Sequence, residues 1–262
     1  MRIVDLSPEH ESIFASCLED RLAEAREAGS LRAEWIHVMK NRGLRAKLAV
    51  DETNTPIGMI QYVPANQTLL DRSPDAYFVY CIWVVRFGDE RGNHQGKGAG
   101  AALLEAAETD ARALGASGMA AWGLLLPIWM RASWFRKHGY RRVDRSGMAA
   151  LMWKPFLPDA PAPKFVLPKK TPERIPGQVT VTSFLHGQCR AANVGHERAR
   201  RACAEIGGPV VYRVIDTKDM ATANEWGILD ALYIDDREVR IGPPPSYAKI
   251  KGRIEKSARR IP

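Results

Sequence analysis

The sequence has no long apolar segment. Its longest uncharged runs, residues 53–70 and 113–130, are interrupted by Pro56, Pro64 and Pro127. A membrane-spanning helix needs about 20 predominantly apolar residues. A secretory signal needs an apolar core, whereas the segment MRIVDLSPEHESIF contains acidic residues. We therefore expect a cytoplasmic protein without a membrane segment.

Cysteine is scarce, with Cys17, Cys81, Cys189 and Cys203 far apart and no CxxC pair. This excludes a disulfide scaffold and predicts reduced thiols. A metal site could be considered at His186, Cys189, His196 and Cys203, which are residue types that bind zinc. Their spacing matches no standard zinc site. We predict no bound metal.

Charge of one sign does not gather in runs. The net charge of +8 comes from 38 basic and 30 acidic residues interleaved along the chain. Specific nucleic-acid binding is therefore not expected, because a positive net charge alone favours only nonspecific association. A polyphosphate ligand needs only a local basic patch. With 45% hydrophobic residues, the chain can form one large or two ordinary domains.

Proline is concentrated in one segment, which carries seven prolines between Pro155 and Pro176. Such a density fixes φ repeatedly and removes backbone donors, so neither a helix nor a central strand is expected there. This predicts a domain at 1–154, a linker at 155–177 and a second domain at 178–262. Phe156, Phe165 and Val166 are too apolar for a freely solvated tether, so we expect the linker to lie against a surface.

Before the linker, apolar periodicity predicts an α/β (α+β) domain in the order β-α-α-β-β-β-α-β-α-β-β. The expected helices cover residues 7–28, 31–41, a segment ending at Leu114, and 130–138. The expected strands cover 2–6, a hairpin within 44–64, then 76–86, 118–124, 140–143 and 148–153.

A glycine-rich segment connects the strand at 76–86 to the helix that ends at Leu114. It reads Gln95-Gly96-Lys97-Gly98-Ala99-Gly100, and the apolar residues Ala101, Leu103, Leu104, Ala107 and Ala111 follow it as a buried helix face. Backbone N–H groups at a helix N-terminus bind anions, and Lys97 adds charge. A flexible strand-to-helix turn is the alternative.

Gln95, Gly98 and Gly100 match the Gln/Arg-x-x-Gly-x-Gly/Ala motif of the GNAT family, which residues 1–154 resemble. The segment Trp134-Phe135-Arg136-Lys137-His138-Gly139-Tyr140 resembles that family's Phe-Tyr-Glu-Lys-x-Gly-Phe helix end. The resemblance implies a mixed sheet flanked by helices and acetyl-CoA as acyl donor. It assigns the cofactor to residues 95–100, to the strand backbone of Trp83, Val84 and Val85, and to Phe135 and Lys137.

The family's chemistry is attack by an amine on the acetyl thioester, and the departing thiolate needs a proton. The tyrosine that commonly supplies it aligns with Phe135, which has none to give. His138 and Tyr80 are the candidate substitutes. The alternatives are helix C-terminal capping for His138 and core packing for Tyr80.

On the acceptor side, Trp122, Trp129 and Trp134 suggest an aromatic or apolar wall, with ordinary core packing as the alternative. Asp89 and Glu90 could attract an amine-bearing small molecule or peptide, although a solvated loop is the favoured explanation for them.

After the linker, the expected order is β-α-β-α-β-β-α, which resembles a thioredoxin-like domain. Cys189 lies at the strand-to-helix turn where such a domain carries its first active-site cysteine. Position 192 is alanine, so dithiol exchange is not expected, and Cys189 is either a single reactive thiol or structural. The pairing of the two domains resembles bacterial YoaP-like proteins.

The leading hypothesis is an N-acetyltransferase whose C-terminal domain helps to form the acceptor site or recruits the acceptor. A non-catalytic acyl-CoA-binding or partner-binding protein is the alternative that Phe135 favours. A thiol-based protein is a third possibility and depends on Cys189 alone.

Overall fold

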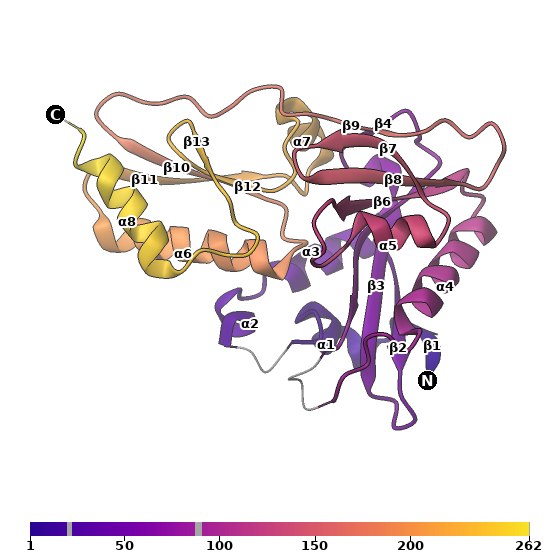
Figure 1. Ribbon diagram of the computed structural model, residues 1–262. Coiled ribbons are helices and arrows are strands. Elements are labelled where there is room, and N and C mark those ends of the chain that lie inside the picture. The colour runs from indigo at the N-terminus through magenta and orange to yellow at the C-terminus, as the bar shows by residue number, and fades with distance from the viewer. Residues whose placement is uncertain (20–22, 87–90, 262) are drawn as a thin grey trace. The chain divides into compact units, whose positions relative to one another are not determined.

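A computed structural model describes residues 1–19, 23–86 and 91–261 (Figure 1). Contacts divide the chain into two compact units. Unit 1 comprises Met1–Glu19 and His37–Val166, and unit 2 comprises Asp20–Ile36 and Leu167–Pro262. These units differ from the expected domains, because residues 20–36 group with the C-terminal part and residues 155–166 with the N-terminal part.

Unit 1 contains a seven-stranded sheet in the order β1-β2-β3-β5-β6-β8-β7. Its strands are β1 (Arg2–Asp5), β2 (Arg45–Val50), β3 (Pro56–Pro64), β5 (Tyr77–Val84), β6 (Gly118–Leu124), β7 (Arg141–Ser146) and β8 (Ala149–Pro155). The helices that follow β5 and β6 are α4 (Ala99–Ala113) and α5 (Ala132–Lys137). The predicted mixed α/β sheet flanked by helices is confirmed for this unit.

The prediction of one continuous helix over 7–28 was wrong. A 3-10 turn, η1 (Pro8–His10), leads into α1 (Glu11–Ala15), and α2 (Ala23–Glu27) is a separate helix. Cys17 and Leu18 between them have φ of 58° and 61°. These left-handed conformations cannot continue a right-handed helix. The turn buries Leu18 completely. The next helix, α3 (Leu31–Lys40), is close to the predicted 31–41.

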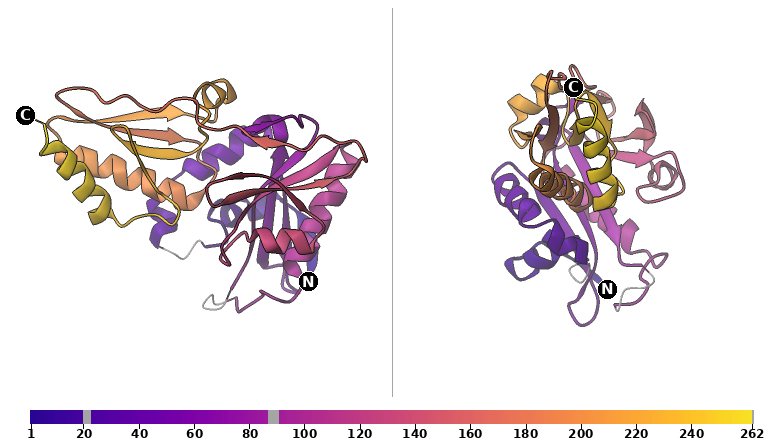
Figure 2. Two further views of the ribbon diagram at one scale, coloured as in Figure 1. Left: turned by 45° about the horizontal axis from the view of Figure 1, so that its top comes forward. Right: turned by 90° about the vertical axis from the view of Figure 1, so that its left-hand side faces the viewer.

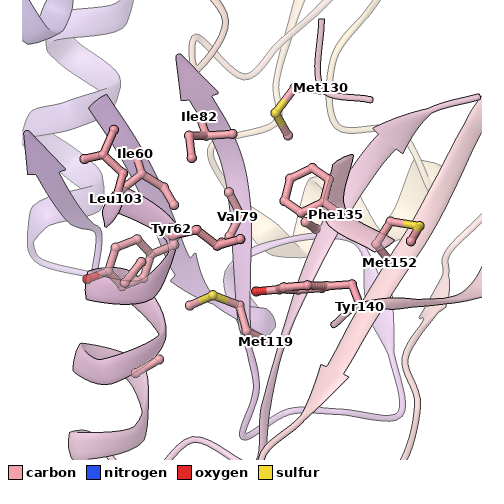
Figure 3. Close-up of a cluster of buried hydrophobic side chains, with 14 of the residues drawn as sticks. Ile60, Tyr62, Val79, Ile82, Leu103, Met119, Met130, Phe135, Tyr140 and Met152 are labelled. Carbon is pink, nitrogen blue, oxygen red and sulfur yellow. The ribbon is translucent and has the colours of Figure 1, made fainter. Parts of the chain in front are cut away.

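One face of the unit 1 sheet forms the core that α4 and α5 cover. Leu103 of α4 and Phe135 of α5 belong to the same buried cluster as Ile60 and Val79 of the sheet (Figure 3). The predicted apolar face of α4 is confirmed at Leu103, Leu104, Ala107 and Ala111. Ala101 is an exception, since it is exposed and lies away from that face.

Strands β5 and β6 are parallel neighbours for only a short distance. Their pairing comprises Tyr77 with Met119, Phe78 with Ala120, and Val79 with Ala121. β6 then stays paired with β8 along its full length and leaves β5. In the second half of β5, residues 81–84 are therefore paired with β3 on one side, after a register shift at Tyr80. On the other side no strand among the described residues pairs with residues 80–84, so this edge is open.

The first part of the proline-rich segment packs on unit 1. Its residues β9 (Lys164–Phe165) pair with β4 (Leu70–Asp71), which follows the 3-10 turn η2 (Ala65–Gln67). The Phe165 N–H donates to the Asp144 carboxylate over 2.9 Å. The expectation that this segment forms neither a helix nor a central strand is confirmed.

Unit 2 contains a four-stranded sheet in the order β11-β10-β12-β13. Its elements are β10 (Val179–Leu185), α6 (Arg190–Ile206), β11 (Val210–Asp216), α7 (Met220–Trp226), β12 (Ala231–Ile234), β13 (Arg237–Val239) and α8 (Tyr247–Ala258). β10 is parallel to β11 and antiparallel to β12. The predicted element order is confirmed.

Helices cover both faces of the unit 2 sheet (Figure 2). α6 and α8 bury one apolar cluster against β10 and β12, with Ile250 and Ile254 of α8 fully buried in it. Phe184 of β10 and Trp226 of α7 form a second cluster on the opposite face. Within the described residues, no helix has the length and apolar character that a membrane span requires.

Candidate active site

A cavity of about 690 Å³ opens along the free edge of β5 in unit 1. Three segments form its wall: the end of β5, the glycine-rich loop before α4, and the connection from β6 to α5. The lining residues are Ile82, Trp83, Val84, Arg86, His94, Gln95, Gly96, Gly98, Gly100, Ala101, Pro127, Ile128, Trp129, Met130, Arg131 and Trp134.

The glycine-rich loop forms an anion cradle at one end of this cavity. Gly96 and Gly98 have φ of 77° and 87°, a left-handed conformation that glycine adopts readily. Gly98 is the N-cap of α4 and contributes no capping side chain. The first N–H groups of the helix therefore point outward without an intrahelical acceptor. A Cβ on Gly96 or Gly98 would have no protein atom within 4 Å, so the space beside each of these glycines is open.

Gly100 has a different role within the same loop. A Cβ there would lie 3.4 Å from Trp134 Cζ2, an ordinary contact. Ala99 is buried under the first turn, whereas Lys97 is exposed and does not line the cavity. The structure thus brings Gln95, Gly96, Gly98 and Gly100 together around one cavity.

Arg86, His94 and Arg131 also line the cavity, and sequence reasoning missed them. Arg86 lies over the Trp83 ring, 5.9 Å from its centroid. The Nε2 atom of His94 contacts the Arg91 carbonyl oxygen at 2.6 Å. Arg86 ends the apolar run AYFVYCIWVVR, and a cation at the end of a strand that leads into a phosphate loop is a signal that could have identified it. Two guanidinium groups next to a helix N-terminus favour a polyanionic ligand.

Side-chain donors occupy three backbone carbonyls on the open edge of β5. Trp122 Nε1 donates to the Tyr80 carbonyl over 2.8 Å, Trp129 Nε1 to the Ile82 carbonyl over 3.3 Å, and Gln95 Nε2 to the Val84 carbonyl over 3.1 Å. Alternate residues of a strand present their backbone groups to the same edge. Tyr80, Ile82 and Val84 therefore form a single row facing the cavity side.

The strand residues predicted to pair with pantetheine divide between the two edges of β5. The Val84 carbonyl faces the open edge through its bond to Gln95. The Val85 N–H donates to Ile57 of β3 over 2.9 Å, and Trp83 is in register with Met59. Val84 is thus the member of this set with a backbone group on the cavity side.

The candidate proton donors in unit 1 have hydrogen bonds of their own. The Tyr80 hydroxyl donates to the Gln67 carbonyl over 3.0 Å, and its side chain is buried. His138 Nδ1 donates to the Trp134 carbonyl over 2.8 Å, with the two rings 4.1 Å apart. Neither residue lines the cavity. Their catalytic roles stay predictions.

Phe135 and Lys137 also lie away from the cavity lining. Phe135 is fully buried, with its ring packed edge-on against Trp134 and Tyr140. Lys137 is exposed at the end of α5. The residue at the usual position of the proton donor is therefore part of the core beneath the site.

Of the three tryptophans predicted to form an acceptor wall, two line the cavity and the third packs against one of them. Trp129 and Trp134 line the cavity, and Trp122 packs edge-on against Trp129 with ring centroids 5.1 Å apart. Asp89 and Glu90 lie outside the described residues.

Cys189 belongs to unit 2, where it is the N-cap residue of α6 and is partly exposed. Cys203 lies within the same helix, and burial raises the pKa of its thiol to about 12. His196, further along α6, is part of a buried hydrogen-bond network. Its Nδ1 contacts Ser183 Oγ at 2.9 Å and its Nε2 contacts Asp230 Oδ1 at 2.8 Å.

Several solved structures of acetyltransferases resemble the chain. A GNAT family acetyltransferase from Brucella melitensis in complex with acetyl-CoA is 16% identical, with a TM-score of 0.42, over 61% of this chain and 90% of that one. A GNAT family N-acetyltransferase from Escherichia coli in complex with CoA is 15% identical, with a TM-score of 0.45, over 63% and 88%. An aminoglycoside 6'-acetyltransferase type Ii is 20% identical, with a TM-score of 0.46, over 60% and 99%.

No curated protein matches the chain. A protein-family model does match, and its description is the Acetyltransferase (GNAT) family. The match extends over residues 9–125, a little under half of the chain, and includes β2 to β6 with the glycine-rich loop. Residues 9–125 are therefore a GNAT acetyltransferase domain.

Proposed function

We propose that unit 1 binds acetyl-CoA in the cavity along β5 and transfers the acetyl group to an amine. The observation that carries the proposal is the cradle of Gly96 and Gly98, which opens into the same cavity as the free edge of β5. An anion site adjoining an unpaired strand edge suits a ligand with a pyrophosphate at one end and amides along its length.

Each wall of the cavity has a separate task in this proposal. The N–H groups of the first turn of α4 bind the pyrophosphate, and Arg86 and Arg131 add charge around it. The carbonyls of Ile82 and Val84 accept hydrogen bonds from the pantetheine amides, so Trp129 and Gln95 must release them first. Acetyl-CoA supplies an activated thioester, whose carbon–sulfur bond breaks as the amine nitrogen forms its bond to the acetyl carbon.

The attacking amine loses a proton to solvent water in the open cavity, and the departing thiolate gains one from a protein group. His138 and Tyr80 are the proposed proton donors, each after exchanging the hydrogen bond it makes in this structure. Phe135 is confined to a packing role by its complete burial.

Calorimetry with acetyl-CoA, followed by mass spectrometry of free CoA in the presence of an amine panel, tests the proposal. We expect one acetyl-CoA bound per chain and amine-dependent release of CoA. A folded protein that does not bind acetyl-CoA would disprove it.

A non-catalytic CoA-binding protein is the second candidate. The observation that favours it is the engagement of both candidate donors, Tyr80 and His138, in hydrogen bonds away from the cavity. Binding without CoA release for any amine, at any pH between 6 and 9, would select this candidate.

For unit 2 we propose a thioredoxin-like domain that contributes to acceptor binding through Cys189. The strand order β11-β10-β12-β13, with only β11 parallel to β10, supports this assignment. So does the position of Cys189 where β10 passes into α6. A Cys189→Ser variant should keep acetyl-CoA binding and lose acceptor turnover. Unchanged turnover would remove the thiol from the proposal.

A further inference from the structure

The connection from β6 to α5 holds large apolar side chains in solvent. The exposed fraction of each residue is 36% for Leu125, 44% for Leu126, 52% for Ile128 and 38% for Trp129. Met148, in the turn between β7 and β8, is 42% exposed. We call these five residues the apolar loop patch. Exposed apolar residues scattered singly are normal on a protein surface, whereas a contiguous patch marks a binding surface.

The backbone holds the patch in place. The Leu124 N–H donates to the Met130 carbonyl over 2.6 Å and closes the loop at its base. The Leu125 N–H donates to the Met148 carbonyl over 3.0 Å and joins the loop to the β7–β8 turn. The side chains of the patch are thus directed outward by a hydrogen-bonded backbone.

The patch is continuous with the cavity. Ile128 and Trp129 belong to both, and Pro127 between the two leucines and Ile128 also lines the cavity. The Trp129 ring packs edge-on against Trp122, a contact that does not depend on the bond from Trp129 to the Ile82 carbonyl. A ligand that covers the patch can therefore reach into the cavity past Ile128 and Trp129, which belong to both.

The apolar loop patch itself selects among amines. Its five residues carry no charge, and the Trp129 indole is their only side-chain hydrogen-bonding group. A polyamine or an aminosugar would place several charged or hydroxyl groups against this surface without hydrogen-bond partners, which costs free energy. An amine with a single ionisable nitrogen on an apolar body avoids this cost.

We propose that the apolar loop patch binds the apolar body of the acceptor, so that the acceptor is an amine on an aromatic or branched aliphatic group. This inference rests on the proposed acetyltransferase function and deepens it. The amine end enters at Ile82 and Trp129, and the apolar body covers Leu126, Ile128 and Met148.

The test compares phenethylamine and isopentylamine with ethanolamine, spermidine and kanamycin, using acetyl-CoA and mass spectrometry of released CoA. Phenethylamine and isopentylamine should be the better substrates by kcat/KM. Leu126→Ser should raise the KM for phenethylamine roughly tenfold, since it removes most of one leucine contact. It should leave the kcat and the affinity for acetyl-CoA unchanged, because Leu126 is outside the cavity lining.

Leu114→Ser is the matched control, because Leu114 is 50% exposed at the far end of α4. Equal effects of the two variants on the KM for phenethylamine would overturn the inference. Turnover of spermidine or kanamycin alone would also overturn it. So would a protein that binds acetyl-CoA but acetylates none of the five amines. Sedimentation at several concentrations tests a second copy as the occupant. A dimer that Leu126→Ser dissociates would also overturn it. Failure of acetyl-CoA binding would instead overturn the proposed function.

Discussion

Replacing Gly98 by glutamate separates the cost of backbone strain from the loss of the anion cradle. Gly98 and Gly115 flank the same helix, α4, with φ of 87° and 81°. A Cβ at either position has no protein atom within 4 Å. Gly98→Glu and Gly115→Glu should therefore cost the same conformational strain, about 1–2 kcal/mol each. The helix dipole should partly offset the cost at Gly98 and add to it at Gly115, by about 0.3–1 kcal/mol.

Only Gly98→Glu should affect the ligand. Its side chain enters the cradle and brings a negative charge to the place where a pyrophosphate would bind. Each charge-assisted hydrogen bond lost is worth about 1.5–3 kcal/mol, so the loss of two weakens acetyl-CoA binding by roughly 100-fold or more. Thermal unfolding measures the strain and calorimetry measures the affinity. If Gly98→Glu folds and binds acetyl-CoA as Gly115→Glu does, the cradle is not the cofactor site.

Three further variants or measurements test other parts of the chain. Burial raises the pKa of the Asp110 carboxyl, but hydrogen bonds from Arg45 and Tyr62 lower it by more. The pKa therefore lies below its ordinary value. The stability from this group is therefore present above about pH 4 and lost as pH falls further. Asp110→Asn should cost about 2 kcal/mol near pH 7 and less at pH 3, as thermal unfolding would show. Phe135→Tyr places a hydroxyl in the core, so it should destabilise the protein by about 1–3 kcal/mol without raising activity, measured by unfolding and CoA release. Iodoacetamide mapping at pH 6.5 should label Cys189 before Cys203, whose thiol pKa is about 12; the reverse order would contradict the helix-terminus placement.

The order of elements could be predicted because each element carries a local signal. The strand at 118–124 was predicted to the residue, since Gly115 ends the preceding helix and an apolar run follows it. The single helix over 7–28 could not be corrected from the sequence. Its break depends on Leu18 finding a buried position, which is a tertiary effect.

The glycine loop was predictable because its glycines are needed for a local conformation. The indole donors on the open edge of β5 were not predictable in the same way. Trp122 and Trp129 are 42 and 47 residues from the carbonyls that they meet, and no local pattern indicates such a pair. The same applies to the network of Ser183 in β10, His196 in α6 and Asp230 just before β12, which come from three separate segments.

The close packing of α5 on β6 depends on a glycine outside the cavity. β6 continues alongside β8 to Leu124, and α5 packs directly on its end. A Cβ on Gly123 would lie 2.8 Å from Ala132 Cα, closer than atoms in proteins approach, so glycine is what permits this contact. Because α5 is held there, the loop between β6 and α5 returns toward β5 and brings Trp129 to the Ile82 carbonyl. The wall of the cavity thus follows from the packing of a helix that itself contributes only Trp134 to the lining.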